Sequence, residues 1–203
     1  MSVTNGYCTV ADVREQLNDV VNEQLSEALL ERAVNASSRA VDRFCHRRFW
    51  LDAEPVARTY RPCEPYRADV DDIGTTAGLV IKTDTGGDGT WATTWQTGDY
   101  DLEPLNADAD GPAYAWWTIV SVGNQQFFSL PLRPSLQVTA RWGWSIVPDD
   151  VETAALLKAV SLFKRKDSPL GVAGFAEFGA VRISRSDPDV VSLLQPYVRP
   201  EFA

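Results

Sequence analysis

Histidine is almost absent from this sequence, and the spacings of histidine and cysteine that bind metals are absent altogether. His46 is the only histidine among 203 residues, and Cys8, Cys45 and Cys63 are the only cysteines. No CxxC or HxxxH spacing occurs, which argues against a zinc site. Cys45 and His46 are adjacent on a predicted helix and point in different directions, so they make a poor nucleophile–base couple. We therefore assign no catalytic residue, no metal ligand and no cofactor, and we expect free thiols.

Two loops contain only part of a ligand-binding motif. Residues 106–111 read NADADG, like the first half of a calcium loop, but position 7 is Pro112 and position 12 is Trp117, where a glutamate is required. A polar turn before a strand is the simpler interpretation, and calcium is the alternative. Residues 86–89 read GGDG without the Lys-Ser/Thr that completes a phosphate loop, so we predict a plain connection between strands.

Long apolar runs are also missing. No stretch approaches the ~20 apolar residues of a membrane span. The first ten residues, MSVTNGYCTV, lack a basic region followed by an apolar one, so we expect no secretory signal and a cytoplasmic compartment. With 44% hydrophobic and 23% charged residues, the composition is that of a globular protein with one domain, or one plus an insertion.

No part of the chain is net positive. The formal charge is −9 overall, made up of −1 over residues 1–50, −7 over 51–147 and −1 over 148–203. A protein that reads nucleic-acid sequence needs a basic face, so this class is excluded. The acidic middle part has two interpretations. It is an ordinary solvated surface, or it lines a passage through which DNA slides without sticking.

The N-terminal part predicts helices. Thr9 and Asp12 are the start signal of a short helix that extends to about Leu17, and a longer helix is expected from about Asn22 to His46. Small and apolar residues follow one side of the longer helix and suit close packing in a compact bundle. They are Leu25, Ala28, Leu29, Ala33, Ala36, Ala40 and Phe44, with Leu30, Val34 and Val41 widening the apolar arc.

The middle part predicts strands. Leu136 to Trp144 alternates apolar and polar residues as a half-buried strand does, and Leu79–Thr83 and Trp117–Val122 are further candidates. The tryptophans of this part permit two interpretations: core packing, or an aromatic platform for sugar binding. These residues are Trp91, Trp95, Trp116, Trp117, Trp142 and Trp144.

The segment from Asp149 to Gly179 is the most informative. Asp149, an N-cap candidate, and Glu152 have the spacing of a capping box, which predicts a helix whose last turn contains Lys164, Arg165 and Lys166. Its apolar residues occupy nearly the whole circumference, so the helix is either central in its own domain or shared with a neighbouring molecule. A strip rich in glycine and phenylalanine follows, and an apolar strip of this kind favours a partner that covers it.

The last residues predict a short strand and a short helix. Ala180–Ser184 is the strand candidate, and Asp187 with Pro188 at the next position starts a helix through Leu194. We therefore expect a mainly α fold: a small helical bundle with a β-rich insertion between the second and third helices. The expected parts are N-terminal helices (1–50), the insertion (51–147), and the central helix, strip and tail that complete the bundle (148–203).

Three stretches together resemble a known family. They are YCTVADVREQL, LLERAVNASSRAVDRFCHRRF and VPDDVETAALLKAVSLFKRKDSPLGVAGFAEFGAVRISRSDPDV. They are similar to the head-to-tail adaptor (connector) proteins of tailed bacteriophages, especially phages of actinobacteria. The last stretch is the most specific, through LFKRKDSP and its Gly-Phe motif. The resemblance covers both helical ends, about half of the chain, and the insertion matches only loosely.

The resemblance implies a virion structural protein without catalysis or cofactor. Such a protein forms a twelve-fold ring below the portal, prolongs the DNA channel and joins head to tail. Its implied partners are copies of itself, the portal protein and tail-side neck or tail terminator proteins, with non-specific passage of double-stranded DNA and no membrane. The implied location is the virion neck, reached from the host cytoplasm during assembly.

By the same resemblance, residues after the third helix contact the portal or a neighbouring subunit, namely Gly171 to Ile183 and the tail to Ala203. The candidate partner-binding residues are Lys164, Arg165, Lys166, Leu170, Gly171, Val172, Gly174, Phe175, Phe178, Gly179 and Arg182. Two other classes of function stay open: a carbohydrate-binding β module on a helical base, and a hydrolase that uses the acidic loops.

Overall fold

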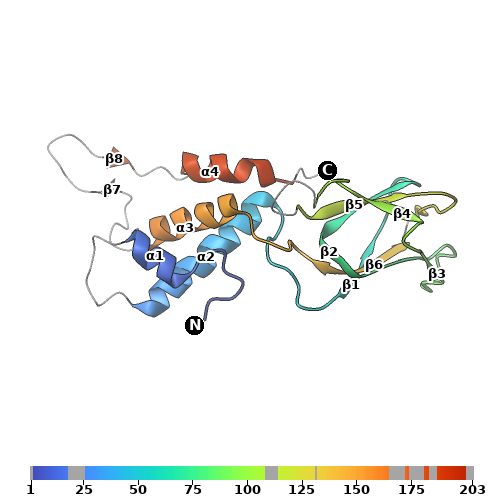
Figure 1. The fold of residues 1–203 in the computed structure, drawn as a ribbon, viewed down its shortest axis with the longest axis horizontal. Coiled ribbons are helices and arrows are strands. Elements are labelled where there is room, and N and C mark those ends of the chain that lie inside the picture. Colours follow the sequence, from blue (N-terminus) through green and yellow to red (C-terminus); the bar gives the residue numbers. More distant parts are fainter. Residues whose placement is uncertain are drawn as a thin grey trace. The chain divides into compact units, whose positions relative to one another are not determined.

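The computed structural model of the chain divides into two compact units (Figure 1). One combines Met1–Arg47 with Val147–Ala203 and is helical, and the other is the β unit Arg48–Ile146. The structure describes residues 2–17, 26–107, 114–130, 132–164, 172–173, 181–182 and 187–199.

The helical unit packs its helices around α3. Its elements are α1 (Val10–Gln16), α2 (Glu27–Cys45), α3 (Asp149–Lys164), α4 (Pro188–Leu194), the 3-10 turn η2 (Gln195–Tyr197) and the strands β7 (Val172–Ala173) and β8 (Val181–Arg182). Helix α3 contacts α1, α2 and α4, and the four helices lie side by side in Figure 1. Its buried residues are Val151, Ala154, Ala155, Ala159, Val160 and Phe163. Contact with three helices of its own unit accounts for the wide apolar arc of α3.

The predicted start of α1 is confirmed. The Thr9 hydroxyl accepts from the Asp12 amide at 3.1 Å, and the Asp12 carboxylate accepts from the Thr9 amide at 2.7 Å. This reciprocal pair satisfies two amides that the first helical turn leaves without partners. The predicted cap of α4 is confirmed too, since the Asp187 carboxylate accepts from the Asp189 amide at 3.1 Å and Pro188 is the first helical residue.

The start of α3 and the end of α2 can be compared with their predicted positions. Helix α3 begins at Asp149 itself, because the amides of Val151 and Glu152 already donate to the carbonyl of Pro148. Asp149 is therefore not the N-cap, and that prediction is wrong by one residue. The longer N-terminal helix ends at Cys45, followed by His46 in the left-handed region at φ 53°. Its expected start near Asn22 lies outside the described residues.

The β unit is an antiparallel sheet with strand order β1-β6-β2-β5-β4, with β3 paired to β2. The strands are β1 (Val56–Tyr60), β2 (Arg67–Thr83), β3 (Thr93–Thr94), β4 (Tyr100–Glu103), β5 (Trp116–Ser121) and β6 (Leu136–Trp142). Strand β6 alternates buried and half-buried residues along its whole length, as predicted. Its buried side chains join Ile73, Ile81 and Ile119 in the core of this unit.

The predicted mainly α fold is wrong. Helix makes up about 32% and strand about 25% of the chain, which is an α+β fold. The prediction recognised only the last five residues of β2 as strand. The pairing of this 17-residue strand shifts register between Asp69 and Ile73, between Ile73 and Thr75, and between Thr75 and Val80. Such irregularities break the period-two pattern by which strands are recognised in a sequence.

Candidate interaction surface

Three of the predicted partner-binding residues, Lys164, Val172 and Arg182, belong to described elements of the helical unit. Lys164 is the exposed last residue of α3. Val172 and Arg182 pair with each other across β7 and β8. The remaining candidates lie outside the described residues: Arg165, Lys166, Leu170, Gly171, Gly174, Phe175, Phe178 and Gly179.

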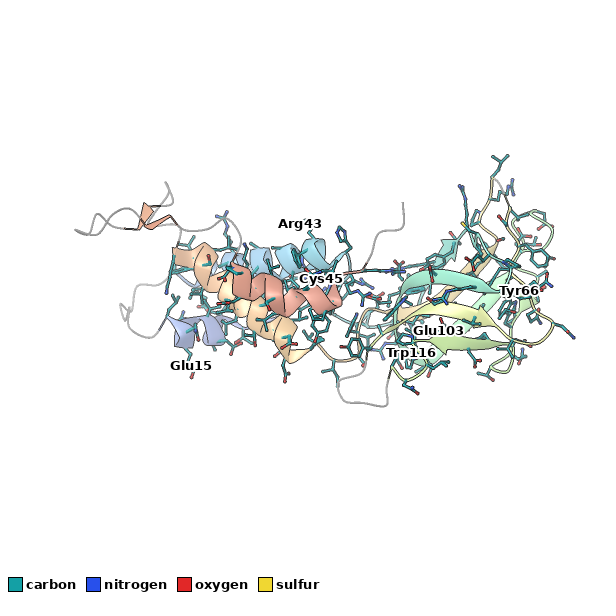
Figure 2. The ribbon with its side chains drawn as sticks, turned by 90° about the horizontal axis from the view of Figure 1, so that it is seen from above. Glu15, Arg43, Cys45, Tyr66, Glu103 and Trp116 are labelled. Atoms are coloured by element: carbon teal, nitrogen blue, oxygen red, sulfur yellow. The ribbon has the colours of Figure 1, made fainter. Side chains whose placement is uncertain are left out.

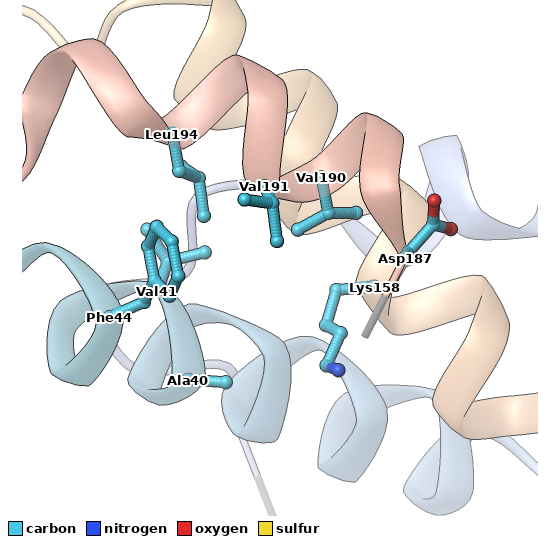
Figure 3. Close-up of a pocket in the computed structure, with 8 residues that line it drawn as sticks. All are labelled: Ala40, Val41, Phe44, Lys158, Asp187, Val190, Val191 and Leu194. Carbon is cyan, nitrogen blue, oxygen red and sulfur yellow. The ribbon is translucent and has the colours of Figure 1, made fainter. Parts of the chain in front are cut away.

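A groove that was not predicted lies between α2 and α4 (Figure 3). Its volume is about 130 Å³. Helix α2 contributes Ala40, Val41 and Phe44, α3 contributes Lys158, and α4 contributes Val190, Val191 and Leu194, with Asp187 just before it. The lining is therefore apolar along most of the groove. Lys158 and Asp187 lie together at one end, near the start of α4 (Figure 3).

Phe44 lines this groove with an aromatic side chain that is partly exposed to solvent. Phe44 is 37% exposed, although burial of an aromatic side chain away from water is energetically favourable. Leu29, on the same helix, is 39% exposed. The sequence carried part of this signal, because Leu29, Ala40 and Phe44 all lie on the predicted apolar side. It carried no sign of the partner helix, since α4 is far away along the chain.

Loops of the β unit expose a second set of apolar side chains. Leu132 is 86% exposed and Tyr66, labelled in Figure 2, is 53% exposed. The Arg61 guanidinium donates to the carbonyl of Leu132 at 3.3 Å, and the Gln126 amide donates to the Tyr66 hydroxyl at 3.1 Å. These loops are tied down by hydrogen bonds.

The cysteines of the helical unit are poor nucleophiles. Burial raises the pKa of the Cys45 thiol from 9.0 to about 12. Burial, with a contribution from Asp12, raises the pKa of Cys8 to about 11. A reactive cysteine needs the opposite shift. No group of three or more histidine, cysteine or acidic residues in the described part of the chain has a metal-binding arrangement.

The two incomplete loop motifs have different outcomes. In the glycine loop, the buried Asp84 carboxylate accepts from the amides of Gly86 (3.1 Å), Gly87 (2.7 Å) and Gly89 (2.8 Å). These amides stabilise the loop itself and are not directed at an external phosphate. In the calcium-like loop, which starts at Asn106, residues 108–113 lie outside the described residues. The twelfth position of this loop, Trp117, is in β5.

Three of the six tryptophans considered for sugar binding are core residues. Trp95, Trp142 and Trp144 are 4%, 0% and 1% exposed. Their indole N–H groups donate to Thr83 Oγ1 at 3.2 Å, to the Val56 carbonyl at 2.7 Å and to Asp72 Oδ2 at 3.1 Å, respectively. Trp91, Trp116 and Trp117 are half-buried. A buried indole cannot stack on a sugar, so these positions favour the core interpretation.

Solved structures with a similar fold come from phage-like particles. No protein-family model matches the chain, and no curated protein is similar to it in sequence. A chain in the structure titled "Neck of empty GTA particle computed with C6 symmetry" is similar with 17% identity and a TM-score of 0.57, over 100% of this chain and 95% of that one. A chain in "Virion of native gene transfer agent (GTA) particle" has 16% identity and a TM-score of 0.54, over 100% and 95%.

A third similar chain belongs to "Neck of native GTA particle computed with C12 symmetry". It has 17% identity and a TM-score of 0.53, over 100% of this chain and 94% of that one. At this level of identity the similarity establishes a shared fold. The fold spans both units, the β unit included, and nearly the full length of each similar chain. Among the described residues, no helix has the length and apolar character needed to cross a bilayer.

Proposed function

We propose that this chain is a structural protein of the neck of a phage-like particle. In this proposal it acts as a head-to-tail adaptor: copies form a ring below the portal, prolong the DNA channel and join head to tail. It acts through shape and buried interface, without catalysis and without a cofactor. The proposed partners are other copies of the chain, the portal protein and tail-side neck or tail terminator proteins.

One observation carries this proposal: the fold is shared over the whole chain with chains of solved GTA particles, two of them described as necks. The similarity covers 100% of this chain and 94–95% of each of the three. A local likeness of helices alone occurs in many unrelated proteins. A combination of helical unit and β unit in the same order is a more specific arrangement. Two of the three structures describe necks, computed with C6 and C12 symmetry, and twelve copies is the number we propose.

The surface chemistry is consistent with assembly. In a ring, each copy contacts the next one head-to-tail, and the same contact repeats around an axis until the ring closes. Each copy must therefore present two different surfaces that are complementary to each other. The helical unit has an apolar groove with the exposed Phe44 in its wall. Its sequence also contains the glycine- and phenylalanine-rich strip after α3. These are the two surfaces we assign to assembly contacts.

The charge is consistent with passage of DNA. The β unit contains 13 acidic and 7 basic residues, and the whole chain is at −9. Phosphates are repelled by such a surface, so double-stranded DNA passes a ring of this composition without being held. We propose non-specific passage and no sequence recognition.

A double substitution in the strip tests the function. Phe175→Ser with Phe178→Ser removes two apolar side chains that we assign to contacts, so we expect a folded protein but DNA-filled heads that lack tails. The measurement is the yield of infectious or transducing particles, with electron microscopy of the heads. Phe128→Ser is the matched control, because Phe128 is an exposed phenylalanine in a loop of the β unit. A normal yield of joined particles from the double variant would contradict the proposal.

A further inference from the structure

Arginines follow the outer side of α2. Arg32, Arg39 and Arg43 lie within about 40° of one another around the helix, because an α-helix turns by about 100° per residue. The buried residues of α2 lie on the opposite side of the helix, which packs in the helical unit. They are Leu30, Ala33, Val34, Ser37, Ser38, Val41 and Cys45. The three arginines therefore form an outward surface of the helical unit, which we call the arginine face.

The arginine face carries positive charge that its own unit leaves uncompensated. Arg39 forms an ion pair with Asp42 at 2.9 Å. Among the described residues, no carboxylate forms an ion pair with Arg32 or Arg43, and both arginines are exposed. Arg39 and Arg43 are one turn apart, and like charges at this spacing destabilise a helix. Leu29, one turn before Arg32, is 39% exposed. Arginine beside exposed apolar surface is typical of contact sites between proteins.

Four carboxylates gather on the other side of the helical unit. Asp12 and Glu15 are one turn apart on α1, and Asp149 and Glu152 are one turn apart at the start of α3. Burial and the negative charges of Asp149 and Asp12 raise the pKa of Glu152, so these carboxylates of two helices act on one another. Figure 2 shows Arg43 of α2 on one side of the helical unit and Glu15 of α1 on the opposite side. We call these four residues the acidic cluster.

Charge complementarity favours another copy of this chain as the partner of the arginine face. The arginine face and the acidic cluster lie on opposite sides of one unit, so they meet when copies are arranged head-to-tail. A guanidinium binds a carboxylate through two parallel hydrogen bonds, which gives such a contact a defined geometry. Double-stranded DNA also attracts arginine. However, the chain is at −9 and no part of it is net positive, so the molecule as a whole repels phosphates.

We infer that the arginine face of one copy docks on the acidic cluster of the next copy. This inference rests on the proposed ring, and it adds an electrostatic contact to the groove and the strip. Arg32 and Arg43 bind carboxylates of the neighbour, and Leu29 loses its exposure to water in the contact. Repeated around an axis, a head-to-tail contact of this kind closes into a ring.

Reversal of charge on either side of the contact tests the inference. One variant, the face variant, carries Arg32→Glu and Arg43→Glu. The other, the cluster variant, carries Glu15→Lys and Glu152→Lys, and all four positions are exposed. Each variant is assembled with portal-bearing heads and the other neck proteins, and rings are counted by electron microscopy. Either variant alone places like charges across every contact, so we expect the yield of rings to fall by about tenfold or more.

Combination of the two variants should restore assembly. In an equal mixture, each copy of the face variant meets the cluster variant on both sides with opposite charges. We therefore expect rings in which the two alternate, with a yield within about twofold of wild type. Native mass spectrometry of the released rings should find equal numbers of the two chains. A chain that carries all four substitutions should also assemble by itself, because both sides of its contact are exchanged.

Arg61→Glu with Arg133→Glu is the matched control. It makes the same change in net charge as the face variant, at two exposed arginines of the β unit, and should leave the yield of rings unchanged. Circular dichroism at 222 nm checks that each variant is folded. If charge reversal unfolds α2, Arg32→Gln with Arg43→Gln replaces the face variant, and we expect a smaller loss of rings that grows with salt concentration.

The outcomes separate this inference from the proposed function. A wild-type yield from the face variant or the cluster variant alone overturns the inference and leaves the ring intact. So does a loss of rings that neither the mixture nor the fourfold variant restores, or an equal loss in the matched control. A face variant that forms normal rings but binds less double-stranded DNA in a mobility-shift assay assigns the arginine face to DNA instead. If electron microscopy finds no rings of the wild-type chain in assembled necks, the proposed function fails, and the inference fails with it.

Discussion

Among the described glycines, Gly143 leaves the least room for a side chain. Its φ is +108°, and a Cβ atom added there would lie 1.9 Å from the carbonyl oxygen of Trp50. Its amide donates to the carbonyl of Asp72 at 2.8 Å, so the chain cannot move away without losing this bond. Gly143 follows β6 and brings the buried Trp144 into the core of the β unit.

We expect Gly143→Ala to destabilise the β unit by about 2 kcal/mol or more, from backbone strain and the contact with Trp50 together. All seven tryptophans lie in this unit, so the midpoint of denaturant unfolding followed by tryptophan fluorescence reports on it. Gly98→Ala is the control, because nothing lies within 4 Å of its added Cβ. Equal unfolding midpoints for Gly143→Ala and Gly98→Ala would show that position 143 does not require glycine.

The three thiols should differ in reactivity. Cys63 is exposed, and Cys8 and Cys45 are buried with pKa values raised to about 11 and about 12. We expect one thiol to react with a maleimide in the native chain near pH 8 and three to react after unfolding, as counted by mass spectrometry. Labelling of Cys45 as fast as Cys63 would show that the packing of α2 against α4 is wrong.

The same shifts predict a dependence on alkaline pH. Unfolding returns both buried thiols to an ordinary pKa near 9.0, so the unfolded chain releases these protons at a lower pH than the folded chain. Their contribution to stability is complete below about pH 9 and is lost as the pH rises toward 11–12.

At the scale of elements, α3 shows how one sequence pattern admitted two interpretations. An apolar arc around the whole helix indicates burial on all sides but does not say by what. The structure places α1, α2 and α4 of the same unit around it. Small residues such as Ala155 and Ala159, both 0% exposed, allow this close approach.

Ala159→Leu tests that packing. The added side chain has no space between the helices, so we expect a loss of about 1–3 kcal/mol in the stability of the helical unit. The loss is measured as a lower midpoint of unfolding by circular dichroism at 222 nm. Thr153→Leu, at an exposed position of the same helix, should change stability by less than about 0.5 kcal/mol. An unaltered midpoint for Ala159→Leu would mean that α3 is not central.

Local signals predicted the elements whose formation depends on nearby residues. The Thr9–Asp12 pair, the Asp187-Pro188 start and the alternation of β6 are each determined within a few positions. Strand β2 was mostly missed, because its register shifts depend on strands β5 and β6 that lie far along the chain. The groove was missed for a similar reason: Ala40 and Val191 meet only after α2 and α4 pack.

At the scale of the whole molecule, the β unit changes what the resemblance alone implied. That resemblance rested on the helical ends, whereas the fold shared with chains of solved GTA particles covers the entire chain. The acidic β unit is thus part of the common architecture and not an addition peculiar to this sequence. This chain has one unit with an apolar groove and one unit with a net negative charge.

Cryo-electron microscopy of the neck of the assembled particle tests the central proposal most directly. We predict a closed ring of this chain next to the portal, with twelve copies around the DNA channel and both units resolved in each copy. A neck without this chain, or with the chain elsewhere in the particle and not in a ring, would contradict the proposal.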